Sequence, residues 1–116
     1  MDVPPGPKPP GSPGDCRALA SVCDAYAQVL GDEIRAAGTI YGIVGSDRWT
    51  GRSARFVRGA ISDWQGSAHD AEGSLRGLAS QLRRAADELT LAQTDWQRRS
   101  DRYEAALRDR ARWGRT

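Results

Sequence analysis

The triplet Trp49-Thr50-Gly51 separates two long segments in which no proline occurs and apolar residues recur with helical spacing. A glycine suits a chain reversal at this point, because glycine adopts positive φ without steric cost. A tryptophan beside it can cover the end of a helical core while its indole N–H stays in water. The sequence therefore predicts an all-α chain folded as an antiparallel two-helix hairpin that turns at residues 46–51.

The first predicted helix covers residues 15–45. Apolar residues recur there in alternating steps of three and four, interrupted only by Glu33, and a second apolar stripe lies beside the first. Such a face is wider than one neighbouring helix covers. The first stripe contains Cys16, Leu19, Cys23, Tyr26, Leu30, Ala37, Ile40 and Val44, and the second contains Val22, Val29, Ala36 and Ile43.

The second predicted helix runs from Arg52 to about Arg112, a length of roughly 90 Å at 1.5 Å per residue. Two heptad positions stay apolar through most of it. One position holds Ile61, Ala68, Leu75, Leu82, Leu89, Trp96 and Tyr103, and the other holds Val57, Trp64, Ala71, Leu78, Ala85, Ala92 and Ala106. We assign to the core of the hairpin Leu19, Tyr26, Leu30, Phe56 and Trp64.

The long second helix leaves apolar residues without an intrachain neighbour. A reversal near residue 48 would place Cys16 opposite about residue 81, so that the apolar positions from Leu89 to Tyr103 extend past the first helix. The N-terminal tail could reach them but has few apolar side chains, and we therefore expect a partner chain to cover them. The predicted partner interface is Leu75, Leu78, Leu82, Leu89, Trp96 and Tyr103.

Composition divides the chain into three parts. All six prolines occur at or before Pro13, so residues 1–14 are expected to be a disordered Pro/Gly-rich tail, with Ser12 or Asp15 capping the first helix. Residues 15–90 form the hairpin, and residues 91–116 form an Arg-rich helical extension. The N-terminus lacks the apolar core of a signal peptide, and no apolar run is long enough for a transmembrane segment. We expect a protein that is cytoplasmic when made and secreted, if at all, without a cleaved signal.

Several residues after the triplet form a recognisable pattern with it. Phe56-Val57 and Trp64 follow Trp49-x-Gly51, and the stretch 74–79, Ser-Leu-Arg-Gly-Leu-Ala, falls on the same helical repeat. Over about residues 15–90 the chain thus resembles the WXG family of small ESAT-like proteins, which are exported by type VII (ESX-like) secretion systems.

The resemblance implies a non-enzymatic secreted substrate or partner protein. Two hairpins would pair into a four-helix bundle, as a homodimer or as a heterodimer with a neighbouring WXG-type protein. Trp49 and Gly51 would form the turn and export motif, which a secretion ATPase reads together with a C-terminal Tyr-x-x-x-Asp/Glu signal. This chain departs from that pattern, because Leu107 stands four residues after Tyr103. The resemblance then implies a partner that carries the signal.

Two other functions stay open. The first is a cytosolic coiled-coil adaptor, or an accessory or chaperone protein of a toxin locus, that binds a partner helix. The second, weaker one is a basic helix that binds nucleic acid through the Arg residues after Arg98, with Trp96, Tyr103 and Trp113 among them. Acidic residues alternate with these Arg residues, which favours a solvated, salt-bridged helix and no nucleic acid.

Catalytic, cofactor and metal sites are not expected. His69 is predicted on the polar side of the second helix with no nucleophile placed to use it, and the pair Asp32-Glu33 is typical of a solvated helix surface. Cys16 and Cys23 are about 10 Å apart on one helix, beyond the roughly 7 Å that a disulfide spans. Both are expected to face the core as small apolar residues, with an intermolecular disulfide as the alternative.

Overall fold

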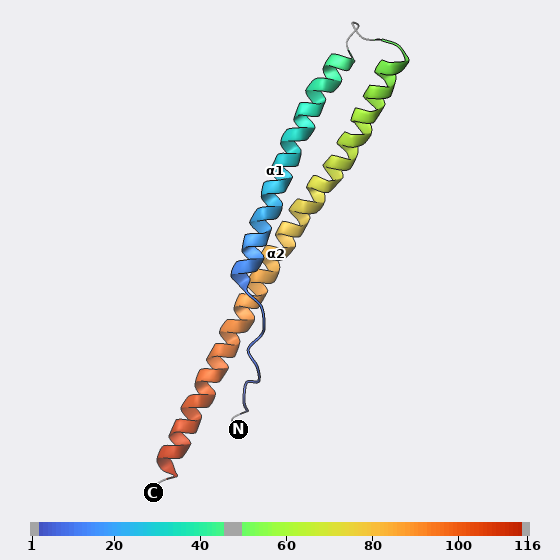
Figure 1. The fold of residues 1–116 in the computed structure, drawn as a ribbon. Helices are drawn as coiled ribbons and strands as arrows, with labels where there is room; N and C mark the ends of the chain where they lie inside the picture. Colours follow the sequence, from blue (N-terminus) through green and yellow to red (C-terminus); the bar gives the residue numbers. More distant parts are fainter. Residues whose placement is uncertain (1–2, 46–49, 115–116) are drawn as a thin grey trace.

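Two antiparallel helices of unequal length make up most of the chain (Figure 1). A computed structural model describes residues 3–45 and 50–114. Helix α1 spans Pro13–Val44, with 32 residues, and α2 spans Arg52–Trp113, with 62 residues. The predicted all-α class with a long second helix is confirmed, since the described ranges contain no strand. The molecule is rod-shaped, with principal extents of 98 × 16 × 12 Å.

Local sequence explains where α1 begins. Ser12 is the N-cap, and its Oγ accepts a hydrogen bond of 3.1 Å from the backbone N–H of Asp15. Pro13 follows at the first helical position, where its missing N–H costs nothing and its fixed φ is already helical. Of the two caps that the sequence allowed, Ser12 is the one used, so α1 starts two residues before the predicted position.

Gly51 sets the start of α2. It has φ +103° and ψ −169°, a conformation that side-chain-bearing residues rarely adopt, and it acts as the N-cap without a side-chain hydrogen bond. The expectation that this glycine supplies a positive φ at the reversal is therefore confirmed. Trp49 lies outside the described residues.

Small residues line the seam between the helices. Ala20 and Ala27 on α1 are fully buried, as are Ala79 and Ala86 on α2. Cys23 joins Ala20 and Ala79 in a cluster against which Leu75 and Leu82 pack. Because alanine projects little beyond the backbone, this seam lets the two helices approach closely.

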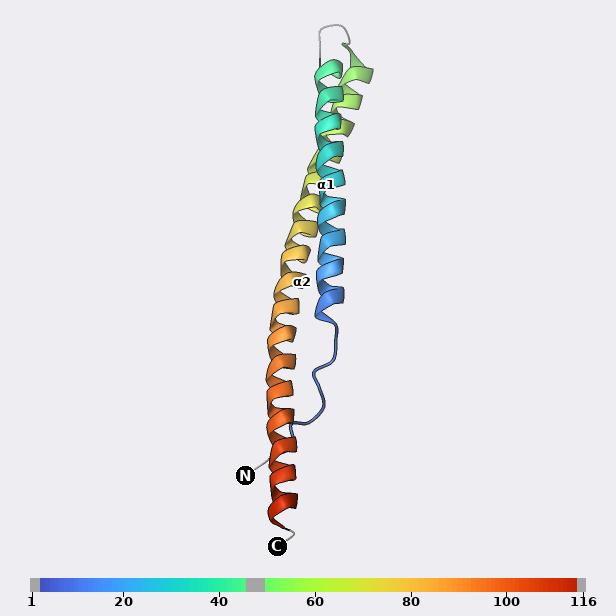
Figure 2. The ribbon, with the colours of Figure 1, turned by 90° about the vertical axis from the view of Figure 1, so that its left-hand side faces the viewer.

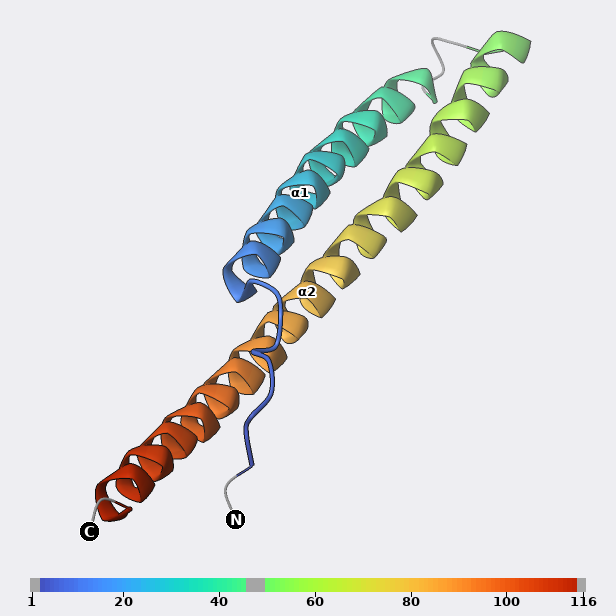
Figure 3. The same ribbon diagram turned by 60° about the horizontal axis from the view of Figure 1, so that its bottom comes forward.

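The register of the hairpin differs from the simple expectation. Arg17 at the start of α1 pairs with Asp87 at 3.1 Å, so this end of α1 lies near residue 87 and not near residue 81. The reason is that α2 starts farther out than the point where α1 ends (Figure 3). A shorter part of α2 therefore extends past α1.

Residues 3–12, here called the strap, continue from α1 along the part of α2 that α1 does not reach (Figures 1 and 2). Gln93 and Trp96 on α2 donate side-chain hydrogen bonds to strap carbonyls. The strap thus provides intrachain cover for a region that the sequence analysis assigned to a partner, because it offers backbone acceptors and proline rings in place of large apolar side chains.

We predict that Ala27→Leu lowers the free energy of unfolding by about 1–3 kcal/mol, because the close seam has no room for the larger side chain. Ala25, two residues away and exposed, is the matched control, and Ala25→Leu should change stability by less than about 0.5 kcal/mol. Urea unfolding followed by circular dichroism measures both. Equal effects of the two substitutions would contradict the close seam.

Gly51→Ala should cost about 1–3 kcal/mol, because a Cβ is strained at φ +103°. Gly59 lies inside α2 with open space around its Cα, so Gly59→Ala should stabilise the protein by up to about 1 kcal/mol. Thermal unfolding of the two variants checks this opposite pair of signs.

Candidate functional site

Helix α1 carries two apolar stripes that are one residue out of step. The inner stripe packs on α2, whereas the outer stripe is rotated from it by about 100° and faces solvent. Members of the inner stripe are buried or half-buried: Cys16, Ala20, Cys23, Ala27, Leu30, Ile34, Ala37 and Val44. The larger members of the outer stripe are 47–66% exposed: Leu19, Val22, Tyr26, Val29, Ile40 and Ile43.

Helix α2 has a matching outer stripe in which Trp64 and Leu78 are 42% and 43% exposed. The stripes of the two helices lie on the same side of the hairpin. A groove of about 300 Å³ shows this, because Ala36 and Ile40 of α1 line it together with Ala60 and Trp64 of α2. We call this surface the apolar face and define it by Leu19, Val22, Tyr26, Val29, Ala36, Ile40, Ile43, Ala60, Trp64 and Leu78.

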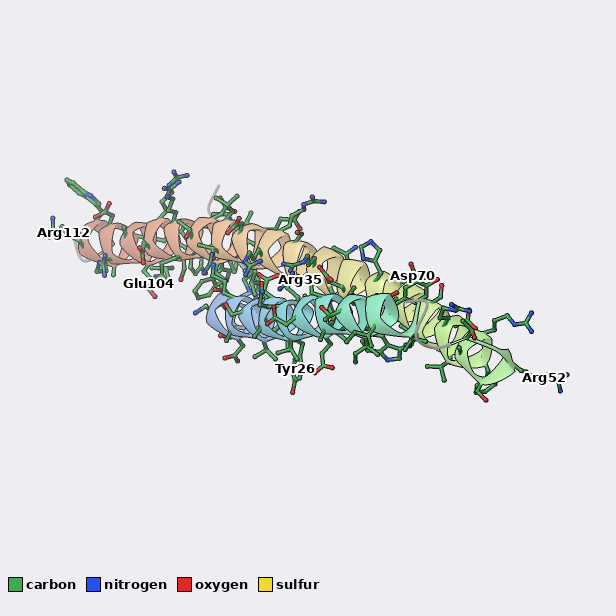
Figure 4. The ribbon with its side chains drawn as sticks, turned by 90° about the horizontal axis from the view of Figure 1, so that it is seen from above. Tyr26, Arg35, Arg52, Asp70, Glu104 and Arg112 are labelled. Carbon is green, nitrogen blue, oxygen red and sulfur yellow. The ribbon has the colours of Figure 1, made fainter. Side chains whose placement is uncertain are left out.

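The opposite side of the hairpin is polar. Two ion pairs bridge the helices there, Arg17–Asp87 at 3.1 Å and Asp24–Arg83 at 2.6 Å. The side of the hairpin follows from the position relative to the seam. Residues one position after a seam residue lie on the polar side, as Arg17, Asp24 and Arg83 do, and residues one position before it lie on the outer stripe. Tyr26 and Arg35 accordingly leave α1 on opposite sides (Figure 4). The hairpin is thus amphipathic as a whole.

One acidic residue interrupts the apolar face. Glu33 occupies the outer-stripe position between Val29 and Ala36 and lines the same groove as Trp64. Within the described part of the chain, its carboxylate has neither an ion pair nor a hydrogen-bond partner. It is therefore the polar group that anything covering this face would have to accommodate.

The structure separates the residues that the sequence analysis assigned to a partner interface. Leu75 and Leu82 pack on the intrachain cluster, and Leu89 and Trp96 lie beside the strap. Tyr103 is half-buried on α2. Of the six residues, Leu78 alone belongs to the apolar face.

The core assignment needs a correction for the single chain. Leu30 is half-buried, but Leu19, Tyr26 and Trp64 lie on the exposed apolar face, and Phe56 is 77% exposed at the start of α2. The physical reason is that the sequence analysis combined members of two stripes and omitted Ala20 and Ala27. The available signal was the run of small residues at steps of three and four, which marks the closer helix contact.

The remaining candidates add no chemistry. Cys23 is buried in the seam and Cys16 is half-buried, both as free thiols, in agreement with the expected core-facing role of Cys23. His69 is exposed. Among the described residues there is no grouping of three or more metal-ligating side chains. Neither described helix has an apolar stretch of the length and composition needed to cross a bilayer.

Comparisons with protein-family models, with curated proteins and with solved structures each gave no match to this chain. The resemblance to WXG proteins therefore depends on the motif and its spacing, and the case for a functional surface depends on the geometry of the apolar face.

Proposed function

We propose that this chain is a non-enzymatic binding protein whose apolar face pairs with a second helical hairpin to form a four-helix bundle. The observation that carries the proposal is the amphipathic hairpin. One side has cross-helix ion pairs, and the other exposes a stripe that is apolar apart from Glu33: Leu19, Val22, Tyr26, Val29, Ile40 and Ile43. Monomeric proteins rarely leave a contiguous apolar surface of this kind in water.

Magnitudes support a second chain as the occupant. Full burial of a large apolar side chain contributes about 1.5–3 kcal/mol, and those of the apolar face are already half covered, which leaves about 1 kcal/mol for each. Summed over the large side chains of the face, this burial free energy approaches the roughly 8 kcal/mol of binding free energy that corresponds to a micromolar Kd. The partner brings its own apolar face, which helps to offset the entropic cost of association.

The shape of the face favours a helical partner. The outer stripe follows alternating steps of three and four from Leu19 to Ile43, the repeat that interlocks side chains of paired helices. Glu33 within the stripe favours a partner that presents a hydrogen-bond donor or a cation at this height, because a carboxylate buried alone is costly. A second copy and a neighbouring WXG-type protein are the two forms that such a partner can take.

The sequence resemblance supports export of this bundle by a type VII secretion system. Trp49 and Gly51 would provide the turn motif, and Gly51 has the positive φ that such a turn uses. Since Leu107 replaces the acid of a Tyr-x-x-x-Asp/Glu signal, the partner would supply the signal that the secretion ATPase reads. The chain would be made in the cytoplasm and leave without a cleaved signal.

Pairing through the apolar face predicts that Val29→Lys weakens association at least tenfold, because a lysine ammonium would be buried in the interface. Gln28→Lys adds the same charge one position away on the polar side and should leave association unchanged. Sedimentation velocity measures self-association, and co-expression with the product of a neighbouring gene measures hetero-association. Equal behaviour of the two variants, or a wild-type chain that stays monomeric at high concentration and binds no neighbouring gene product, would refute the pairing.

Export through the turn motif predicts that Trp49→Ala keeps the complex folded but lowers the secreted amount at least tenfold. Phe56→Ala is the control, because Phe56 is an exposed aromatic residue close to the turn and outside the motif. Immunoblots of culture medium and cell pellet measure the partition between the two. Normal export of the Trp49→Ala protein would favour the adaptor function over the secretion function.

A further inference from the structure

The strap is held on α2 by three hydrogen bonds from two side chains. The amide Nε2 of Gln93 donates to the carbonyl oxygens of Pro9 and Gly11 at 3.1 and 3.0 Å. The indole Nε1 of Trp96 donates to the carbonyl oxygen of Gly6 at 2.9 Å. All three acceptors are backbone carbonyls, so these donors contact the main chain of the strap and none of its side chains.

The composition of the strap fits this mode of binding. Prolines have no N–H group, so an extended proline-rich segment can dock without leaving backbone donors unsatisfied. Pro5 and Pro9 are half-buried, whereas the residues between them are exposed. The strap therefore presents to α2 free backbone carbonyls together with rigid apolar proline rings.

Two glycines of the strap have positive φ, and one of them also lies close to α2. Gly6 and Gly11 have φ of +74° and +114°, which proline and most other residues cannot adopt. A Cβ on Gly11 would also come within 2.9 Å of Leu89 Cδ2. The site thus discriminates a Pro/Gly segment from an extended segment of other composition.

The binding residues lie on the same heptad register of α2 that packs against α1 farther along. Ala79 and Ala86 are covered by α1, and Leu89, Gln93 and Trp96 continue the three-four steps under the strap. Gln65, at the equivalent heptad position under α1, donates to the carbonyl oxygen of Ile34 at 3.3 Å, so α2 uses glutamine donors toward both of its covers. Under the strap, Gln93 and Trp96 donate to the carbonyls of a non-helical segment.

We propose that Leu89, Gln93 and Trp96 form a recognition site for Pro/Gly-rich extended segments, which residues 6–11 of the chain occupy intramolecularly. Tethering gives the strap a millimolar effective concentration, so an external segment competes poorly until the strap is released. The site is separate from the apolar face, and this inference does not depend on the proposed pairing function.

The test uses the full chain in NMR spectra of the tryptophan indole 15N–1H groups, in which Trp96→Phe identifies the Trp96 signal. In the wild-type chain this N–H should exchange with water at least threefold more slowly than in a Gly6→Ala/Gly11→Ala double variant, in which the strap cannot dock. A synthetic peptide of residues 1–12 should then shift the signal of the double variant saturably, with a Kd at least tenfold lower than for the wild-type chain.

Two controls decide between recognition and nonspecific contact. Adding Gln93→Ala to the double variant should weaken peptide binding at least fivefold, since both amide hydrogen bonds are lost, whereas Gln97→Ala one turn away should not. A peptide that itself carries Gly11→Ala should bind as weakly as in the Gln93→Ala case. The proposal is overturned if peptide at millimolar concentration leaves the signal of the double variant unshifted, or if Gln93→Ala has no effect.

Discussion

The close contact between α1 and α2 governs the rest of this structure. Ala20 and Cys23 cluster with Ala79, and Ala27 and Ala86 are also fully buried along the seam. Small residues permit the helices to approach closely, but they remove little apolar area from water. Several large apolar residues of α1 lie in a second stripe, one residue out of step and outside the seam: Leu19, Val22, Tyr26, Val29, Ile40 and Ile43.

The separation of the seam from the outer stripe gives the hairpin one polar and one apolar side. The ion pairs Arg17–Asp87 and Asp24–Arg83 join the helices on one side, yet their side chains are partly exposed, and such pairs contribute only about 0–1 kcal/mol. The exposed side chains of the apolar face would contribute further stabilising free energy if another molecule buried them. The binding function proposed above would use this face.

The long arm of α2 shows a second way of covering an apolar helix surface. Beyond the N-terminal end of α1, the strap covers α2 instead. Its proline rings lie against α2, and its carbonyls accept hydrogen bonds from Gln93 and Trp96. The same heptad register of α2 thus packs against helix α1 along one part and against the strap along another. Helix α1 covers Ala79 and Ala86, and the strap covers Leu89, Gln93 and Trp96.

Periodicity and turn chemistry determined much of this protein without tertiary information. The three-four steps and the absence of proline predicted both helices to within two residues, Ser12 was among the expected caps, and Gly51 was expected to take the positive φ at the reversal. These features depend on residues close together in the chain. What only the tertiary structure decided is which of two adjacent stripes on α1 faces α2. Both stripes are apolar, so hydrophobicity alone does not distinguish them, and the structure shows that the stripe with Ala20, Cys23 and Ala27 is the one buried against α2. The same holds for the strap, because its hydrogen bonds join residues more than 80 positions apart, and no local pattern encodes that pairing.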